Sequence, residues 1–536
     1  ANFIITSDDI FEKGEIHENW TLGKQYIISE RKNNDIRGYY TFNSSEFENK
    51  LIAVEGDLSK PTTIFYELDS NAIITNLYEN NLNLATDDGS FRAIGKYING
   101  MIDGRYQNEN GDYYNFSMTL DSVFKEEIKD KKTEKPNTLF PEIWFPNKAF
   151  GFKKTPQHKN IHFKNATIWT NESNGILQNS DLIISEGKII EIGNLLNPLD
   201  YFEEEFETID ASSLHLTSGI IDEHSHIAIS KGVNESSQAV TAEVCIGDVI
   251  NPNDHNIYRQ LAGGTVASQL LHGSANPVGG QSAMIKLRWG SNAEEMKIAN
   301  ADGFIKFALG ENVKQSNWGD FENERFPQTR MGVEQVFYDA FYRAKAYQRA
   351  WKDYNNLSSS DRKKYTAPRE DLELNALVEI LESERFITCH SYVQSEINML
   401  MHVADSMGFT INTFTHILEG YKIANKLKEH KAGASTFSDW WAYKFEVNEA
   451  IPYNATLLNN AGILTAINSD DAEMGRRLNQ EAAKAVKYGG TSEEDAWKMI
   501  TLNPAKLLHI DERMGSIKIG KDADIVLWTD NPLSVY

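Results

Sequence analysis

Between residues 212 and 510, short apolar runs typical of buried strands alternate with longer segments of helical periodicity. The connection at 310–374 is far longer than usual, which predicts an elaboration over one end of the fold. Strands alternating with helices predict an α/β fold, here a (β/α)8 TIM-like barrel. The expected strands lie at 216–221, 265–271, 282–287, 304–309, 386–390, 410–416, 434–437 and 463–467.

Two strand-rich segments flank this region. The first ends in a hairpin at 187–193, and the second has the same alternation of apolar and polar positions. We expect both to join in one small β-sandwich. Its first part is then 155–212, the barrel is 213–510, and the second part is 511–536, which is shorter than a complete sandwich requires.

Residues 1–150 have a different pattern. Aromatic and β-branched runs such as 38–42 and 63–66 are separated by Asn, Asp and Gly clusters, for example at 87–89. This spacing predicts an additional β-rich region at the N-terminus. It contains no catalytic constellation, so its role stays unassigned.

The composition is that of a globular protein, with 40% hydrophobic residues in a chain of 536. A net charge of −24 opposes binding to phosphate-rich partners, so we expect a small-molecule substrate and no nucleic acid. No apolar stretch approaches the roughly 18 residues of a membrane span. The two cysteines, Cys245 and Cys389, are too few for a disulfide framework or a Cys-rich zinc module.

The candidate chemistry lies at the ends of the expected barrel strands. His224 and His226 end the first strand, and alternate residues of a strand point to the same side, so both can reach one ion. His390 ends the fifth strand, His416 the sixth, and Asp470 follows the eighth. Active sites of such barrels lie at the carboxyl ends of the strands. Four histidines and an aspartate there indicate a metal site.

This arrangement resembles the amidohydrolase superfamily, in particular its imidazolonepropionase-like branch, which also holds metal-dependent Xaa-Pro dipeptidases. The resemblance covers about 155–536. It rests on the opening motif LTSGIIDEHSH at 216–226, the closing motif GKDADIV at 520–526, and the flanking sandwich.

The resemblance implies that His224, His226 and Asp470 bind the more buried metal, and that His390 and His416 bind the more exposed one. In binuclear members a carboxylated lysine of the fourth strand bridges the ions, and Lys306 matches that position. A lysine between apolar strand residues is unusual unless it is neutralised, paired or modified. The alternative bridge is Glu311, near the same strand end. If neither bridges, the site is mononuclear.

We therefore predict a hydrolase that cleaves a C–N bond of an amide, dipeptide, N-acyl amino acid or cyclic amide with a metal-activated hydroxide. A divalent ion lowers the pKa of bound water towards about 7, and Asp470 then acts as general acid and base. Imidazole and carboxylate ligands suit zinc best, with manganese, iron or cobalt as alternatives. Two other functions stay open: a mononuclear deaminase of an aromatic amine, and a non-catalytic barrel module.

Substrate contacts are expected from loops at the barrel mouth. His272 and Gln281 lie in or beside a Gly-rich loop after the second strand, where a tight turn is an equally good interpretation. Glu419 and Tyr421 follow His416. Arg476 follows Asp470 and could clamp a carboxylate, although a surface ion pair explains it too.

The ends of the chain suggest a longer polypeptide. The sequence begins without Met and stops where the resembled family adds closing strands, so we expect a further segment or chain to complete it. Association with that segment, or a homo-oligomer, stays open. A periplasmic or secreted bacterial enzyme is the expectation, with a cytoplasmic enzyme as the alternative.

Overall fold

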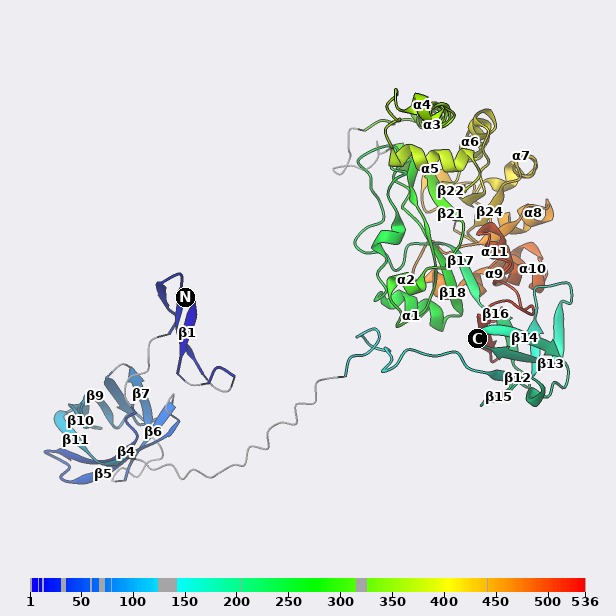
Figure 1. Ribbon diagram of the computed structural model, residues 1–536. Helices are drawn as coiled ribbons and strands as arrows, with labels where there is room; N and C mark the ends of the chain where they lie inside the picture. The colour runs from blue at the N-terminus through cyan, green and yellow to red at the C-terminus, as the bar shows by residue number, and fades with distance from the viewer. Residues whose placement is uncertain are drawn as a thin grey trace. The chain divides into compact units, whose positions relative to one another are not determined.

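The structure is a computed structural model that describes residues 2–7, 9–11, 14–29, 35–57, 60–66, 73–78, 80–123, 142–203, 205–314, 325–440 and 442–535. It forms two compact units, residues 1–140 and 141–536. Figure 1 follows the chain through both, from blue at the N-terminus to red at the C-terminus. Among the described residues, no helix is long and apolar enough to cross a membrane.

The first unit consists of antiparallel strands. A small sheet, β1-β2-β3, precedes an eight-stranded sheet of order β6-β5-β4-β11-β10-β9-β8-β7. A bridge between Thr63 and Ile73 also joins the two outer strands of this order. The bounds are β1 Phe3–Thr6, β2 Ile16–Thr21, β3 Lys24–Ile27, β4 Gly38–Ser44, β5 Lys50–Asp57, β6 Lys60–Phe65, β7 Ile74–Tyr78, β8 Asn81–Ala85, β9 Arg92–Ile98, β10 Met101–Gln107 and β11 Tyr113–Val123.

Aromatic rings fill the core of the eight-stranded sheet. Along β4 buried and less buried residues alternate, as expected for a strand with one face toward a core. Phe42 stacks on Phe116, with ring centroids 5.0 Å apart, and Phe91 stacks on Tyr106 at 5.2 Å. The interior is thus a packed core of rings, which gives this unit its own hydrophobic centre.

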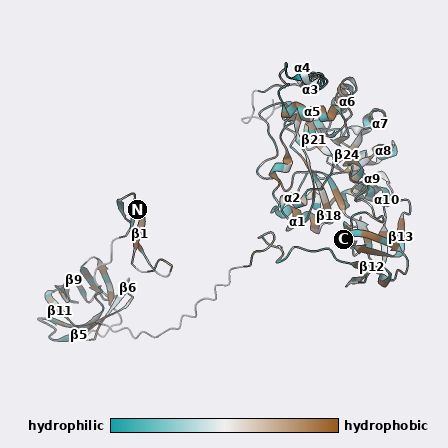
Figure 2. Ribbon diagram, in the orientation of Figure 1, coloured by the Kyte–Doolittle hydropathy of each residue, from teal (hydrophilic) through white to brown (hydrophobic). Residues whose placement is uncertain are grey.

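The second unit begins with a sheet built from both ends of its sequence. The strand order is β14-β13-β12-β16-β26, and β15 pairs with β12. The strand β26, which contains the end of the closing motif, pairs with β16. The C-terminal segment therefore joins the same sheet as β12, β13 and β14. The bounds are β12 Ile161–Trp169, β13 Ile176–Ser185, β14 Lys188–Gly193, β15 Glu207–Asp210, β16 His215–Ser218 and β26 Ile525–Trp528. Figure 2 shows the apolar residues on these strands.

Two further sheets carry the strands predicted for the barrel. One has the order β17-β18-β20 and the other β19-β21-β22-β23-β24-β25. Pairs from β21 to β25 are parallel, as is the pair β17–β18. The bounds are β17 Ile220–Ser225, β18 Thr265–Leu270, β19 Val278–Gln281, β20 Ala283–Lys286, β21 Gly303–Ala308, β22 Arg385–Ser391, β23 Thr413–His416, β24 Gly433–Thr436 and β25 Thr465–Ile467.

The third expected strand differs from the regular barrel pattern. Its residues form β20, which runs antiparallel to β18, while the preceding β19 runs antiparallel to β21. The chain between β18 and β19 covers only 271–277. Only Ser282 separates β19 from β20, so the chain turns back once, at 271–277, before both strands. That turn is shorter than the crossover of about a dozen residues, usually with a helix, that a parallel return needs.

Helices accompany the parallel strands, and Figure 1 labels them along the second unit. The long connection predicted at 310–374 contains the 26-residue helix α3 and the short α4. The bounds are α1 His255–Ala262, α2 Ala293–Met296, α3 Arg330–Asn355, α4 Ser359–Arg362, α5 Leu372–Leu381, α6 Gln394–Met407, α7 Ala424–His430, α8 Asn454–Asn460, α9 Leu478–Gly489, α10 Glu493–Lys498 and α11 Leu502–Leu507.

A buried ion cluster ties the closing motif to β20. Lys286, only 8% exposed, pairs with Asp522 at 2.7 Å and with Asp524 at 2.6 Å. Lys286→Met leaves both carboxylates without this cation, so we expect the free energy of unfolding of the second unit to fall by about 3 kcal/mol. Chemical denaturation measures this. The matched control is Lys188→Met, because Lys188 pairs with the same Asp522 but is 49% exposed, and its loss should cost about 1 kcal/mol or less.

Candidate metal centre

Five of the predicted site residues meet where parallel strands end. His224 lies on β17 and His226 directly follows it. His390 lies on β22, His416 ends β23, and Asp470 follows β25. The register of the parallel ladders brings them together, since Ser391, next to His390, pairs with His416. Residues far apart in sequence thus lie together at the carboxyl ends of strands from both sheets.

Asp470 lies at the centre of the cluster. Its Oδ1 is 3.3 Å from Nε2 of His224 and 3.2 Å from Nε2 of His226, and its Oδ2 is 3.7 Å from Nε2 of His416. Nε2 atoms of His224 and His226 are 3.2 Å apart. Ligand atoms of His224, His416 and Asp470 all lie within 4.8 Å of one another. The carboxylate of Asp470 thus has the imidazoles of His224, His226 and His416 around it.

The histidine nitrogens are available as ligands. Nε2 of His390 and both ring nitrogens of His416 are buried and have no hydrogen-bond partner among the described residues. Buried polar atoms are normally paired, so unpaired imidazole nitrogens need another explanation. The rings of His390 and His416 lie 4.7 Å apart. A divalent cation fits this donor set, because imidazole and carboxylate are common ligands of such ions.

Burial sets the protonation of the cluster. It lowers the pKa of His224 to about 3 and that of His390 and His416 well below the usual value, because the imidazolium ion loses its contact with water. Neutral rings keep a free lone pair. Burial alone would raise the pKa of Asp470, but its contacts with His224 and His226 hold that pKa well below the usual value. The cluster thus combines neutral imidazoles with an ionised carboxylate.

Lys306, on β21, reaches the same cluster. Its Nζ lies 3.0 Å from Nε2 of His224, and the residue is only 1% exposed. Burial lowers its pKa to about 8. The cluster therefore includes an amine that is partly neutral near neutral pH.

Glu311 and Arg476 lie in ion pairs instead. Glu311 pairs with Lys314 at 2.7 Å and with Arg330 at 2.9 Å, so both carboxylate oxygens are occupied. Arg476 pairs with Glu473 at 2.9 Å and is 43% exposed. Within the described part of the chain, neither forms a hydrogen bond or ion pair with the histidine cluster.

His272 and Gln281 hold the loops around β19. Nε2 of His272 accepts the N–H of Glu235 at 2.8 Å, and Nδ1 lies 2.9 Å from the carbonyl oxygen of Gly273. Gln281 donates from Nε2 to the carbonyl oxygen of Ala242 at 2.9 Å. Both side chains thus bond to backbone groups, and their direct role here is to shape the loops.

Glu419 and Tyr421 also bond to backbone groups. Oε2 of Glu419 accepts the N–H of Gln394, the first residue of α6, at 3.0 Å. The hydroxyl of Tyr421 donates to the carbonyl oxygen of Glu449 at 2.9 Å. Glu419 therefore positions the start of a helix that follows His390.

Two buried acids next to His224 were missed by the sequence interpretation. Asp222 is fully buried and accepts the N–H of Ser469 at 3.1 Å and its hydroxyl at 2.5 Å. Burial raises its pKa to about 7. These bonds tie β17 to Ser469, the residue before Asp470. Asp470 itself has a left-handed φ of 48°.

Glu223 is the second of these acids. It is also fully buried, and its two oxygens lie 3.2 and 3.1 Å from the hydroxyl of Thr415. Burial raises its pKa to about 8. Two adjacent acids in a strand that is buried along its whole length are themselves a signal, since a buried acid needs partners.

Aromatic rings pack against the cluster, and the sequence interpretation missed these too. His416 stacks on Phe437 with centroids 4.6 Å apart, and Phe437 stacks on Trp440 at 4.3 Å. The hydroxyls of Tyr392 and Tyr443 lie 3.2 Å apart. The cluster therefore has an apolar wall formed mainly by the loop after β24.

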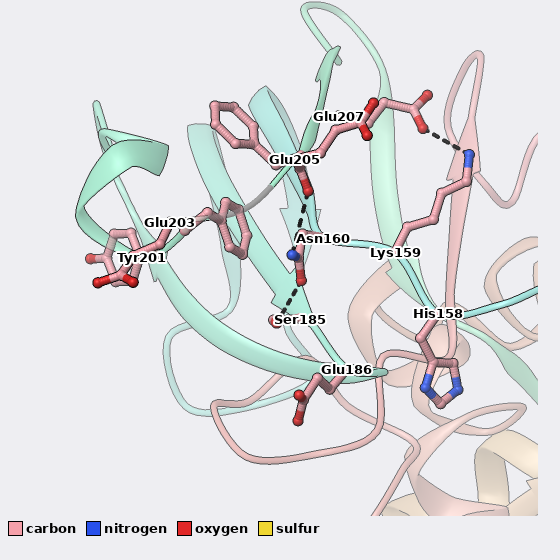
Figure 3. A pocket seen from close by; sticks show the side chains of 11 residues that line it. His158, Lys159, Asn160, Ser185, Glu186, Tyr201, Glu203, Glu205 and Glu207 are labelled. Carbon is pink, nitrogen blue, oxygen red and sulfur yellow. Dashed lines mark hydrogen bonds and ion pairs between the residues drawn. The ribbon is translucent and has the colours of Figure 1, made fainter.

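A pocket of about 900 Å³ lies elsewhere, against the first sheet of the second unit. Figure 3 shows its wall, where Lys159 pairs with Glu207 and Asn160 bonds to Ser185. Glu186, Glu203 and Glu205 also line it. None of the predicted site residues belongs to this pocket.

Comparison with known proteins identifies the family to which this fold and its strand-end cluster belong. The chain belongs to the amidohydrolase family. An amidohydrolase structure from Thermotoga maritima is 31% identical, covers 70% of this chain and 95% of its own, and has a TM-score of 0.62. The profile of the amidohydrolase family matches residues 382–535. The predicted resemblance is thereby confirmed.

Two curated relatives extend this comparison. Amidohydrolase tasK of Hapsidospora irregularis is 29% identical over 381 residues, which cover 66% of this chain but only 38% of that protein. Imidazolonepropionase of Picrophilus torridus is 23% identical over 374 residues, 64% of this chain and 86% of its own. The chain thus spans well under half the length of the fungal relative.

Proposed function

We propose that this protein is a metal-dependent hydrolase of C–N bonds in amides, peptides or cyclic amides. The observation that carries the proposal is the convergence of His224, His416 and Asp470 within 4.8 Å, beside buried imidazole nitrogens that have no other partner among the described residues. Family membership and relatives named amidohydrolase and imidazolonepropionase support it.

His224, His226 and Asp470 would hold one divalent ion, zinc by the chemistry of the donors, and His390 and His416 a second. When bound, the metal supplies a Lewis acid that makes water acidic enough to react near neutral pH. Lys306 is the proposed bridge, after carboxylation of its amine. The surrounding imidazoles stay neutral because of their burial.

Asp470 is the proposed general acid and base. Its ionised carboxylate can accept a proton from the attacking water and later donate it to the departing amine. The hydrogen bond from its N–H to the carbonyl oxygen of His224, at 3.1 Å, fixes it against β17. Asp222 holds the preceding Ser469, so the orientation of the carboxylate is set before substrate binds.

The proposed architecture is a closed barrel formed by the two sheets β17-β18-β20 and β19-β21-β22-β23-β24-β25. Its reversed third strand consists of β19, which pairs with β21, and β20, which pairs with β18. Residues 155–212 and 511–536 would form the sandwich beside it, and 1–150 an accessory β-rich region. The ladder linking β16 to β26 supports the paired sandwich.

Removal of the metal tests the proposal. Treatment with a chelator, followed by dialysis, should reduce hydrolysis of a panel of dipeptides, N-acyl amino acids and cyclic amides by about a hundredfold or more. Zinc or manganese should restore it, with circular dichroism unchanged throughout. Full activity in metal-free protein, or no hydrolysis of any panel member by the metal-loaded protein, would contradict the proposed function.

A further inference from the structure

A lysine side chain lies beside the candidate metal centre. Lys444, in the loop after β24, places its Nζ 4.1 Å from the ring centroid of Tyr392 and 5.6 Å from that of Tyr443. The ring of Tyr392 packs edge-on against His390, with centroids 4.6 Å apart. The ring of Tyr392 thus contacts both the ammonium and His390, and it also stacks on His416 with centroids 5.5 Å apart. A ligand that extends from His390 past Tyr392 would reach this ammonium.

The structure holds this ammonium in place. Nζ of Lys444 pairs with Glu446 at 2.7 Å, and the carboxylate of Glu446 is only 2% exposed. The other oxygen of Glu446 accepts the N–H of Glu311 at 2.9 Å. An ammonium has three donors, so one ion pair orients it without using all of them. The Lys444 side chain is 29% exposed, which leaves it accessible to a ligand.

Aromatic rings near Lys444 add an apolar surface to its positive charge. Phe437 and Trp440, from the same loop, form the apolar wall on His416. A cation that lies beside an apolar wall and is partly shielded from water favours a ligand that has an anionic group next to an apolar side chain. An amide whose amine half is an apolar amino acid carries this combination of a free carboxylate and an apolar side chain.

We propose, resting on the hydrolase function proposed above, that Lys444 binds the carboxylate of the substrate. The substrates are then amides with a free carboxylate, namely N-acyl amino acids and dipeptides with an apolar residue after the cleaved bond. Neutral cyclic amides lack the group that Lys444 recognises. The lysine is a specificity residue and takes no part in proton transfer.

Binding of a matched pair of ligands tests this without hydrolysis. The pair is N-methanesulfonyl-L-phenylalanine and its carboxamide, since the sulfonamide bond resists hydrolysis. Calorimetry on the metal-loaded full chain should show the acid binding about tenfold or more tightly than the amide. Lys444→Met should remove the preference, and Lys444→Arg should keep most of it.

Lys422→Met is the matched control. Lys422 is 27% exposed, pairs with Glu419 at 3.3 Å and with Glu449, and lies 5.8 Å from the ring of Tyr421, so it resembles Lys444 in exposure, ion pairing and ring contact. We expect this variant to keep the preference. Because Lys444→Met leaves Glu446 buried without its cation, the double variant with Glu446→Gln separates loss of the binding group from strain in the loop, and it should also lack the preference.

The outcomes divide cleanly. Equal binding of acid and amide, no binding of either, or a preference that survives in both Lys444→Met and the double variant would overturn the role of Lys444. Metal-dependent hydrolysis without any carboxylate preference would do the same while leaving the proposed function intact. Selective carboxylate binding by a protein that hydrolyses no panel member would support the binding role and count against the proposed function alone.

Discussion

Asp470→Asn is expected to lower kcat for amide hydrolysis by about a thousandfold, with KM changed much less. Asparagine preserves the shape of the side chain but can neither accept the proton from water nor return it to the leaving amine. The carboxylate lies 3.2–3.3 Å from the Nε2 atoms of His226 and His224, so it has the central position in the cluster. Steady-state kinetics on the best substrate of the panel provides the measurement.

Asp471→Asn is the control for this result. Asp471 neighbours Asp470, but its Oδ1 accepts the N–H groups of Glu473 and Met474 at 2.9 and 2.8 Å and so caps a turn. We expect near-normal kcat in that variant. If Asp470→Asn bound metal normally and kept its activity, the general acid and base would have to be another group, and the proton-transfer role of Asp470 would be wrong.

The apolar pattern predicted most strands of the second unit, because they are short, buried and bounded by polar turns. The first expected barrel strand, 216–221, is instead divided between β16 of the first sheet and β17, and β19 was not predicted. The pattern also did not predict the direction of β20. The direction of a strand depends on the length of the preceding connection and on which neighbouring strand has unpaired backbone groups. The apolar pattern of the strand itself contains no information on either.

The residues of the candidate site that could be predicted are those with metal-binding side chains at the ends of expected strands. Four histidines and an aspartate at strand ends of one fold stand out together, so His390 and His416 could be named as candidates before their contacts were known. The aromatic wall and Lys444 could not, since loops place them, and loop residues such as Trp440 have no periodic signal. Conversely, Glu419 looked like a substrate contact by its place in the sequence, yet its carboxylate accepts the N–H that starts α6.

Lys306→Ala is the second large expected effect. If the lysine bridges two ions as a carbamate, elemental analysis of protein purified without chelators should give about two metal equivalents per chain, and the variant about one or fewer, with activity reduced by about a hundredfold. Carbamylation requires the neutral amine to attack CO2 and release a proton, and burial lowers the pKa of Lys306 to about 8, which favours the neutral form.

Lys306→Arg distinguishes loss of the carbamate from loss of a buried cation. Arginine keeps a positive charge near His224, which Nζ of Lys306 approaches at 3.0 Å, but forms no carbamate, so it should resemble Lys306→Ala in metal content. About one equivalent in the unsubstituted protein, unchanged in both variants, would instead make the site mononuclear. Lys306 would then be a cation beside the ligands, and deamination and cyclic-amide substrates would become the first to test.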